Sequence, residues 1–320
     1  MKAVIYEQAG PPEMLRYVEL PLPPVTQADV RIRVQAISVE GGDLRKRSQV
    51  QPPSADHVLG YQAAGTVEEV GAGVTLFKPG DRAVAFNWSG AYAEQFVVPQ
   101  HFAYHIPEDL DLRVAAAMPV TTGTASDALF ELGNAVSGET VLIHGATGGV
   151  GIAAIQLAAA AGLKVIATAS KEEHYPLLLR LGAAEIINHA TERVEVRARE
   201  VNGNRSVDLV VDCAGGPAAS KLLRVLRYRG RISLVGMASG QEASFSFSDI
   251  AARSLAIVGV SFGREMHQQR VRQMLAAHFK AAASGALHVP ISAEFTLDKA
   301  VEAHAYAERR PTLGRVLMTP

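Results

Sequence analysis

The hydrophobic and polar positions divide the chain into two regions with different periodicities. In the first 120 residues, short segments such as 30–34 alternate apolar and polar side chains, and this alternation predicts half-buried strands. Segments 65–74 and 81–86 predict further strands, with proline and glycine between them. Short strands at this spacing are typical of a compact, barrel-like β domain.

Beyond residue 138, predicted strands and helices alternate along the chain. The strands are continuous apolar runs, such as 209–211 and 232–235, which predict a parallel sheet with helices on both faces. The predicted strands are 140–144, 164–168, 185–188, 207–212, 231–235 and 255–260, and the predicted helices are 126–132, 151–161, 174–181 and 218–226. With a further helix at 265–283 and a strand at 314–318, the pattern predicts an α/β protein of two domains.

Composition and charge narrow the functional classes. A chain of 320 residues is too long for one typical core and fits two domains. The formal net charge of −1 supplies no overall field that would attract nucleic acid or an anionic membrane. The longest apolar stretch, 149–163, is shorter than a bilayer requires, and the N-terminus turns polar too soon for a signal peptide. We expect a cytoplasmic protein with neither a nucleic-acid nor a membrane partner.

Cysteine and histidine usage argues against a metal centre. The single cysteine, Cys213, cannot form an intrachain disulfide or a structural zinc site, and it fits a reducing compartment. The ten histidines are scattered without ligand spacing. The sequence therefore predicts no bound metal ion.

A glycine-rich turn is the strongest chemical signal. An apolar strand ends at His144, a turn runs from Gly145 to Gly151, and a predicted helix follows. Glycines let the backbone approach a pyrophosphate closely, and the start of the helix supplies unpaired N–H groups and a partial positive charge. The alternative is a tight strand–helix turn with no ligand, since short glycine motifs recur by chance.

The end of the next predicted strand bears on which dinucleotide would bind. NAD-binding units place an acidic residue there to bind the ribose 2′-hydroxyl, whereas this strand is followed by Ser170 and Lys171. A hydroxyl and a cation favour a 2′-phosphate, which a carboxylate would repel. The interpretation is therefore NADPH rather than NADH. The alternative is that Ser170 caps the next helix and Lys171 is a solvated surface residue.

Short motifs along nearly the whole chain occur in a specific order. They are residues 36–39 with Asp43, 59–67, 79–83, 90–94, 145–151, 181–184, 212–216, 302–304 and 314–317. In this order they resemble the zinc-free quinone oxidoreductases of the medium-chain dehydrogenase/reductase family. The resemblance implies a GroES-like β-barrel catalytic domain from residues 1–122 and 263–320, a Rossmann NADPH-binding domain from 123–262, and a homodimer formed through the Rossmann sheet edge.

The resemblance also implies a set of cofactor contacts, carried over position by position. They are Thr124 at the nicotinamide end, Ala146, Thr147, Gly148, Gly149 and Val150 at the pyrophosphate, Ser170, Lys171 and His189 at the 2′-phosphate, and Val235, Gly236, Ser261 and Phe262 along the nicotinamide. His189 stands where the family commonly has tyrosine.

Three positions separate this chain from the zinc alcohol dehydrogenases of the same family. Those enzymes carry cysteine near position 40 and a His-Glu pair at 61 and 62, where this chain has Glu40, Tyr61 and Gln62. Without zinc, a hydrogen-bond donor must stabilise the developing oxyanion. The catalytic candidates are Tyr61 and Arg45, with Glu40 as a proton donor if burial raises its pKa.

Each catalytic candidate also has a structural alternative. The Tyr61 ring would serve only in packing, Arg45 would be a surface cation, and Glu40 would pair with Arg45 or Lys46. Zinc-free relatives often carry asparagine at position 40 and tyrosine at position 45, so this chain departs from them at both.

Three functional hypotheses follow. The first is NADPH-dependent reduction of quinones or similar electron-poor small molecules. The second is reduction of enones or enoyl compounds on the same architecture. The third is a non-catalytic NADPH-binding protein.

Overall fold

The computed structural model describes residues 1–237, 239–309 and 313–320. Its contacts divide the chain into a first unit, Met1–Val120 with Gly263–Pro320, and a second unit, Thr121–Phe262. The first unit is therefore built from both ends of the chain. The boundary expected at residue 123 lies two residues from the observed one.

The second unit contains a six-stranded parallel sheet in the order β10-β9-β8-β11-β12-β13. Its strands are β8 (Thr140–His144), β9 (Lys164–Ala169), β10 (Glu185–Asn188), β11 (Val207–Asp212), β12 (Leu226–Leu234) and β13 (Ala256–Gly259). The strand order reverses between β8 and β11, the point at which such sheets bind ligands beyond the strands' carboxyl ends. The predicted doubly wound parallel sheet is confirmed.

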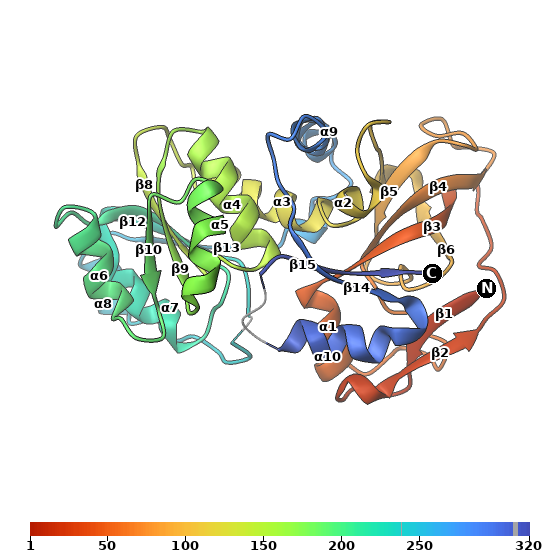
Figure 1. The fold of residues 1–320 in the computed structure, drawn as a ribbon, viewed down its shortest axis with the longest axis horizontal. Helices are drawn as coiled ribbons and strands as arrows, with labels where there is room; N and C mark the ends of the chain where they lie inside the picture. The colour runs from red at the N-terminus through yellow and green to blue at the C-terminus, as the bar shows by residue number, and fades with distance from the viewer. Residues whose placement is uncertain (238, 310–312) are drawn as a thin grey trace. The chain divides into compact units, whose positions relative to one another are not determined.

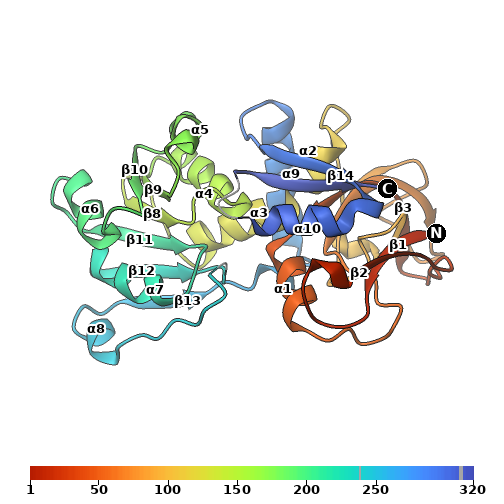
Figure 2. The same cartoon turned by 60° about the horizontal axis from the view of Figure 1, so that its bottom comes forward.

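Helices cover both faces of this sheet. They are α3 (Pro119–Ser126), which begins at the unit boundary, α4 (Gly149–Ala160), α5 (Tyr175–Arg180), α6 (Val194–Val201), α7 (Pro217–Leu222) and α8 (Phe247–Ala251). Figure 2 shows α4 and α5 on one face and α7 and α8 toward the other. This arrangement explains the continuous apolar strands, because Val141, Leu209 and Val210 are completely buried.

Two predicted helices differ from the observed ones. The helix expected at 126–132 is instead a π-helical turn over Asp127–Glu131 that continues from α3. The helix expected to reach residue 226 ends at Leu222 and passes through a 3-10 turn, Leu223–Val225. Leu226 already pairs with Val207 of the neighbouring strand, so sheet pairing overrides the local helical pattern there.

The first unit is built on a seven-stranded sheet and a separate two-stranded sheet (Figure 1). Its strands are β1 (Lys2–Tyr6), β2 (Leu15–Glu19), β3 (Asp29–Val39), β4 (Gln62–Val70), β5 (Arg82–Phe86), β6 (Gln95–Pro99), β7 (Ala103–His105), β14 (Ile291–Thr296) and β15 (Arg315–Thr319). β3 extends well past the predicted 30–34 because a register shift between Val34 and Ala36 lets it keep pairing with β4.

Both ends of the chain contribute to the core of the first unit. Val4 and Ile32 pack in one buried cluster with Ala303 and Met318. The helices of this unit are α1 (Gly41–Gln49), α2 (Leu112–Ala116), α9 (Gln269–Ala283) and α10 (Ala300–Glu308). Within the described ranges, every helix is too short or too polar to cross a lipid bilayer.

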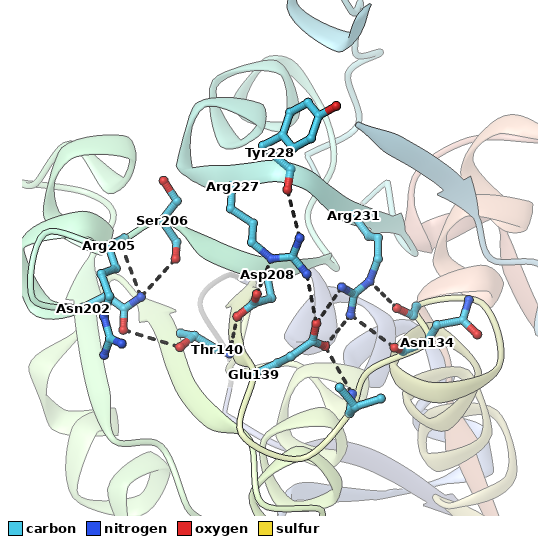
Figure 3. A network of polar contacts seen from close by, with 12 residues as sticks. Asn134, Glu139, Thr140, Asn202, Arg205, Ser206, Asp208, Arg227, Tyr228 and Arg231 are labelled. Carbon is cyan, nitrogen blue, oxygen red and sulfur yellow. Dashed lines mark hydrogen bonds and ion pairs between the residues drawn. The ribbon is translucent and has the colours of Figure 1, made fainter. Parts of the chain in front are cut away.

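An ion-pair network joins β8, β11 and β12 in the second unit (Figure 3). Glu139, directly before β8, accepts from both terminal nitrogens of Arg231 at 2.8 and 2.5 Å, and both side chains are about 85% buried, at 13% and 15% exposure. Asp208 pairs with Arg227 and accepts from the Thr140 backbone N–H at 2.8 Å. The Arg231 hydrogen bonds are the main cause that lowers the pKa of Glu139.

The network yields a test of stability. Glu139→Gln should lower the free energy of unfolding by about 2 kcal/mol at neutral pH, because it leaves a largely buried guanidinium unpaired. Because the folded pKa of Glu139 is lowered, its contribution is present above the unfolded pKa and is lost as the pH falls through the folded value. Urea denaturation at several pH values measures both effects.

The control is Glu302→Gln, because Glu302 pairs with Lys299 and both side chains are more than half exposed. That change should stay within about 0.5 kcal/mol. An equal decrease in the free energy of unfolding in the two variants would show that the Glu139–Arg231 pair contributes no more to stability than an exposed pair.

Candidate functional site

The turn between β8 and α4 is shaped by close backbone contacts. Gly145 has a φ of +79°, in the left-handed region. A Cβ added to Gly151 would lie 2.5 Å from the Gly145 carbonyl oxygen and 2.6 Å from the Ala146 Cα. Gly151 therefore lets the first turn of α4 pack directly against the end of the strand.

The start of α4 is open to an anionic ligand. Gly148 occupies the N-cap position, and no side chain accepts a capping hydrogen bond there. The first N–H groups of a helix have no intrahelical acceptor and carry a partial positive charge. The nearest atom to a Cβ built on Gly148 is 3.8 Å away. The residues expected at the pyrophosphate, 146–150, thus lie at the turn and at the start of a 12-residue helix, and they fit a diphosphate.

The residues expected at a 2′-phosphate lie at the ends of two adjacent strands. β9 and β10 are paired with Asn188 opposite Ala169, so Ser170 and His189 follow at neighbouring positions. Lys171, not Ser170, occupies the N-cap position of the short 3-10 helix that follows, and it makes no side-chain capping hydrogen bond, so the alternative that Ser170 is the N-cap is wrong. The Lys171 ammonium lies 3.3 Å from Glu173, and both side chains are at least half exposed.

A buried polar pair beneath this edge was not found from the sequence. The His144 Nδ1 lies 3.0 Å from the Thr168 hydroxyl, which also accepts from the Gly145 N–H at 3.2 Å. Burial is the main cause that lowers the pKa of His144, and His189, whose ring lies 5.6 Å away, lowers it further. These contacts fit a neutral His144 whose Nδ1 accepts a hydrogen bond from the Thr168 hydroxyl. The Thr168 oxygen then accepts from the N–H of Gly145, the first glycine of the turn.

The loops after β11 and β12 approach each other closely. The Asp212 Oδ1 accepts from the N–H groups of Ala214 and Gly215 at 3.0 and 2.9 Å. A Cβ on Gly215 would lie 2.5 Å from the Gly236 carbonyl oxygen. Val235 and Gly236, both expected along the nicotinamide, therefore lie at a backbone-lined edge of the sheet. Burial strongly raises the pKa of the neighbouring Cys213 thiol, which disfavours the reactive thiolate.

Two other residues expected near the nicotinamide are brought together. Phe262 is 3% exposed, and a Cβ on Gly123 would lie 2.1 Å from its ring. Thr124, the next residue, is 9% exposed. Ser261 is exposed beyond the end of β13.

In the first unit, Tyr61 belongs to an aromatic cluster. Its ring contacts Phe86 and Trp88 edge to face, with centroids 6.0 and 5.8 Å away. Burial is the main cause that raises the pKa of Tyr61 to about 12, the charge of Asp43 adds to it, and Arg45 opposes it. Trp88 is 45% exposed, so it lies at the rim of the cluster rather than in the core.

Glu40 makes a buried ion pair with Arg315, not with Arg45 or Lys46 as hypothesised. Its Oε1 also accepts from the Ser38 hydroxyl and the Gln62 amide, each at 2.8 Å. Arg315 lies 275 positions away in sequence, and no local pattern connects it to Glu40. The Gln62 amide oxygen accepts from the Val120 N–H at 3.0 Å, so both ends of that side chain are engaged.

The third catalytic candidate, Arg45, is exposed on α1, and its Nε donates to Gln49 at 3.2 Å. Across residues 1–237, 239–309 and 313–320, no group of three or more His, Cys, Asp or Glu side chains is placed to hold a metal ion.

Gly151 provides a test of the turn. Gly151→Ala should lower the free energy of unfolding by about 2 kcal/mol, because its methyl group would overlap backbone atoms that have no room to move. Gly148→Ala, whose added methyl group makes only an ordinary van der Waals contact at 3.8 Å, should cost about 1 kcal/mol or less. Denaturant midpoints of the two variants measure the difference, and a Gly151→Ala protein as stable as the unaltered chain would refute the close approach.

Known protein families match both units. Residues 26–108 match the family model of the alcohol dehydrogenase GroES-like domain, and residues 149–280 match that of zinc-binding dehydrogenases. The chain is 34% identical to the rat quinone oxidoreductase over 311 residues, which covers 95% of this chain and 93% of the relative. It is 31% identical to the human quinone oxidoreductase over 308 residues, with the same coverage.

Solved structures match along the entire chain. The Escherichia coli quinone oxidoreductase complexed with NADPH has a TM-score of 0.94 at 28% identity, with 100% of both chains covered. A 2-haloacrylate reductase has a TM-score of 0.87 at 31% identity, with 100% of this chain and 99% of the other covered.

Proposed function

The chain belongs to the quinone oxidoreductases of the medium-chain dehydrogenase/reductase family, and from this membership we propose that it reduces quinones with NADPH and without zinc. The second unit is the NADPH-binding domain, and the first is the catalytic domain. The observation that carries the proposal is the uncapped start of α4 behind its glycine turn, which suits the diphosphate of a dinucleotide.

The strand ends of the second unit support NADPH over NADH. Ser170, Lys171 and His189 offer a hydroxyl, a cation and an imidazole at neighbouring positions. The first acidic residues lie beyond them, in the 3-10 helix Glu172–His174. A 2′-phosphate would compete with Glu173 for Lys171, whose present pairing is exposed and therefore weak.

The side chains of the first unit support zinc independence. At the positions where zinc enzymes of the family carry ligands, Glu40 is paired with Arg315, Gln62 is held at both ends, and Tyr61 packs in an aromatic cluster. A tyrosine hydroxyl, a paired carboxylate and a neutral amide form a poor ligand set for zinc. They leave Tyr61 as the hydrogen-bond donor for the reaction.

The chemistry requires one proton for each quinone reduced. Bound NADPH supplies a hydride, and the hydride with one proton converts a quinone to a hydroquinone. Tyr61 donates its phenolic proton to the quinone oxygen as negative charge develops there. Its surroundings disfavour the tyrosinate, since its pKa is raised to about 12, so the phenol must be reprotonated promptly. Arg45, whose charge opposes that rise, stabilises the developing anion, and Glu40 serves to position β3 and α1 rather than to donate a proton.

A second substrate class is an electron-poor alkene conjugated to a carbonyl. The similarity to a 2-haloacrylate reductase along the entire chain favours it. NADPH consumption with 1,4-quinones and with haloacrylates or enones, followed by product analysis, separates the two. Reduction of alkenes alone would replace the quinone assignment.

Cofactor choice is tested at Lys171. Lys171→Glu should weaken NADPH binding at least tenfold more than NADH binding, because the new carboxylate repels only the 2′-phosphate. Fluorescence titration of both cofactors measures the ratio. The control is Lys221→Glu, an equal charge change at an exposed position of α7. Equal weakening of NADPH and NADH binding would refute the 2′-phosphate assignment.

The donor role is tested at Tyr61. Tyr61→Phe keeps the ring in its cluster and removes only the hydroxyl, so kcat should fall about 100-fold while the KM for NADPH is unchanged. Tyr104→Phe is the matched control, because it removes another buried hydroxyl of the first unit, one that donates to the Met266 carbonyl oxygen. Comparable kcat values in the two variants would exclude Tyr61 as the donor.

A further inference from the structure

A chain of three buried side chains crosses the first unit from α1 to α10. The Tyr92 hydroxyl lies 3.1 Å from the Asp43 Oδ2 and 3.0 Å from the His304 Nε2. All three residues are completely buried. They come from α1, the loop before β6 and α10, so three distant segments meet at one hydroxyl group.

Buried atoms without hydrogen-bond partners lie at both ends of this series of three side chains. Among the described residues, the Asp43 Oδ1 and the His304 Nδ1 are buried and have no hydrogen-bond partner. Buried polar atoms without partners are uncommon in folded proteins. Here the two atoms are those through which a proton would enter and leave.

The hydrogen-bond pattern permits a proton to pass along the chain. With Asp43 ionised, Tyr92 donates to the Asp43 Oδ2, and the His304 Nε2–H donates to the Tyr92 oxygen. When a proton binds the His304 Nδ1, the Nε2 proton moves to the Tyr92 oxygen and the original Tyr92 proton moves to the Asp43 Oδ2. Each group ends neutral, and one proton has moved from histidine to aspartic acid.

Each end of the series of three side chains lies near a further ionisable group. At the outer end, Glu308 lies one turn beyond His304 on α10, pairs with the buried Arg47, and is 38% exposed, so the turn of α10 that follows His304 carries a solvent-exposed carboxylate. At the inner end, Asp43 follows Gly42, whose backbone the Tyr61 ring contacts: a Cβ on Gly42 would lie 2.9 Å from the Tyr61 hydroxyl oxygen.

We propose that His304, Tyr92 and Asp43 form a buried proton relay that reprotonates Tyr61 after each reduction. The proposal rests on the function proposed above, in which Tyr61 donates a proton to the quinone. None of the three residues is placed against the substrate; they act through Tyr61. In each cycle Asp43 gives its proton from Oδ1 to the tyrosinate, and the relay returns one proton from solvent to Asp43 at Oδ2. The His304 proton then exchanges from Nδ1 to Nε2, and the Tyr92 hydroxyl and the Asp43 carboxyl reorient, which restores the starting arrangement for the next cycle.

The acid–base properties agree with this direction of transfer. The pKa of Asp43 is raised to about 7. Burial is the main cause and the Glu40 charge adds to it, whereas the hydrogen bonds from the Glu40 backbone N–H and from Tyr92 oppose the rise. Because the pKa of Tyr61 is about 12, transfer from Asp43 to the tyrosinate is favourable. Burial also lowers the pKa of His304 to about 3, so its imidazolium exists only transiently. The charged and titratable groups facing the relay are Glu40, Lys46, Arg47, Tyr61 and Arg315.

The kinetic test uses three variants that preserve shape. Tyr92→Phe, Asp43→Asn and His304→Gln should each lower kcat about ten- to a hundredfold with the KM for NADPH unchanged. The decrease in kcat on transfer from H2O to D2O should be larger for Tyr92→Phe than for the unaltered enzyme. Small buffer acids should restore part of the kcat of Tyr92→Phe. In the unaltered enzyme kcat should fall as the pH rises through about 7, where Asp43 loses its proton, and Asp43→Asn should lack this dependence.

The control is Tyr104→Phe, with thermal denaturation to verify that every variant is folded. A kcat and solvent isotope effect in Tyr92→Phe equal to those of Tyr104→Phe would overturn the relay. A loss of kcat that no buffer acid restores, with an unchanged isotope effect, would also overturn it and indicate a structural role.

A second measurement needs neither substrate nor cofactor. The infrared difference between the unaltered protein and Asp43→Asn should contain a carboxylic acid C=O band that disappears near pH 7. In Tyr92→Phe this band should persist to higher pH, because the hydrogen bond that lowers the Asp43 pKa is gone. The relay would be overturned if the band has disappeared by pH 5, or if the pH at which it disappears is the same in Tyr92→Phe as in the unaltered protein. If the unaltered protein reduces no quinone but the band behaves as described, the proposed function is wrong, whereas the proton-transfer pathway from Tyr92 to Asp43 is supported.

Discussion

The close approach of Gly151 to the turn at Gly145 and Ala146 is the constraint on which the second unit depends. With no side chain between them, α4 begins almost at the end of β8, and its first N–H groups are left without acceptors. The helix lacks a capping side chain, although such a cap commonly stabilises a helix by about 1 kcal/mol. An anionic ligand at this position would supply the missing acceptors, so the same geometry that leaves the helix incomplete makes the turn a binding site.

In its described residues, the first unit buries two carboxyl groups, those of Glu40 and Asp43, which are accommodated in different ways. Glu40 and Arg315 neutralise each other, and hydrogen bonds from Ser38 and Gln62 satisfy the carboxylate. Pairing of this kind is required because an isolated buried charge would be very costly. Within the described part of the chain, Asp43 is buried without a cation as a direct hydrogen-bonded partner, and burial is the main cause that raises its pKa. Two carboxylates three residues apart therefore have different properties because of their surroundings alone.

The sequence predicts well those features that local pattern determines. The apolar runs predict the parallel sheet, and three of its strands, 140–144, 185–188 and 207–212, have the predicted bounds. The glycine turn is recognisable because its spacing reflects a backbone requirement. The positions of Ser170 and His189 next to each other follow once β9 and β10 are paired.

Features that depend on distant partners are not predictable in this way. Arg315 and His304 lie more than 200 residues from the side chains they contact. Helix α10 was not predicted because its Ala-rich sequence buries only three of its residues, Ala300, Ala303 and His304. The hypothesis that Glu40 pairs with Arg45 or Lys46 was wrong for the same reason, since a local search cannot find a partner that arrives at the end of the chain.

The discontinuity of the first unit has a consequence for biosynthesis. β15, at the end of the chain, pairs with β3 and carries the arginine that neutralises Glu40. The ribosome synthesises β3 long before β15. The second unit is contiguous and is complete while β3, although paired with β4 and β6, still lacks its third partner, β15. We expect the nascent protein to acquire its nucleotide-binding half first. The amino-terminal half then has an unpaired strand edge and an uncompensated acid until β15 is synthesised, and an exposed strand edge of this kind favours aggregation.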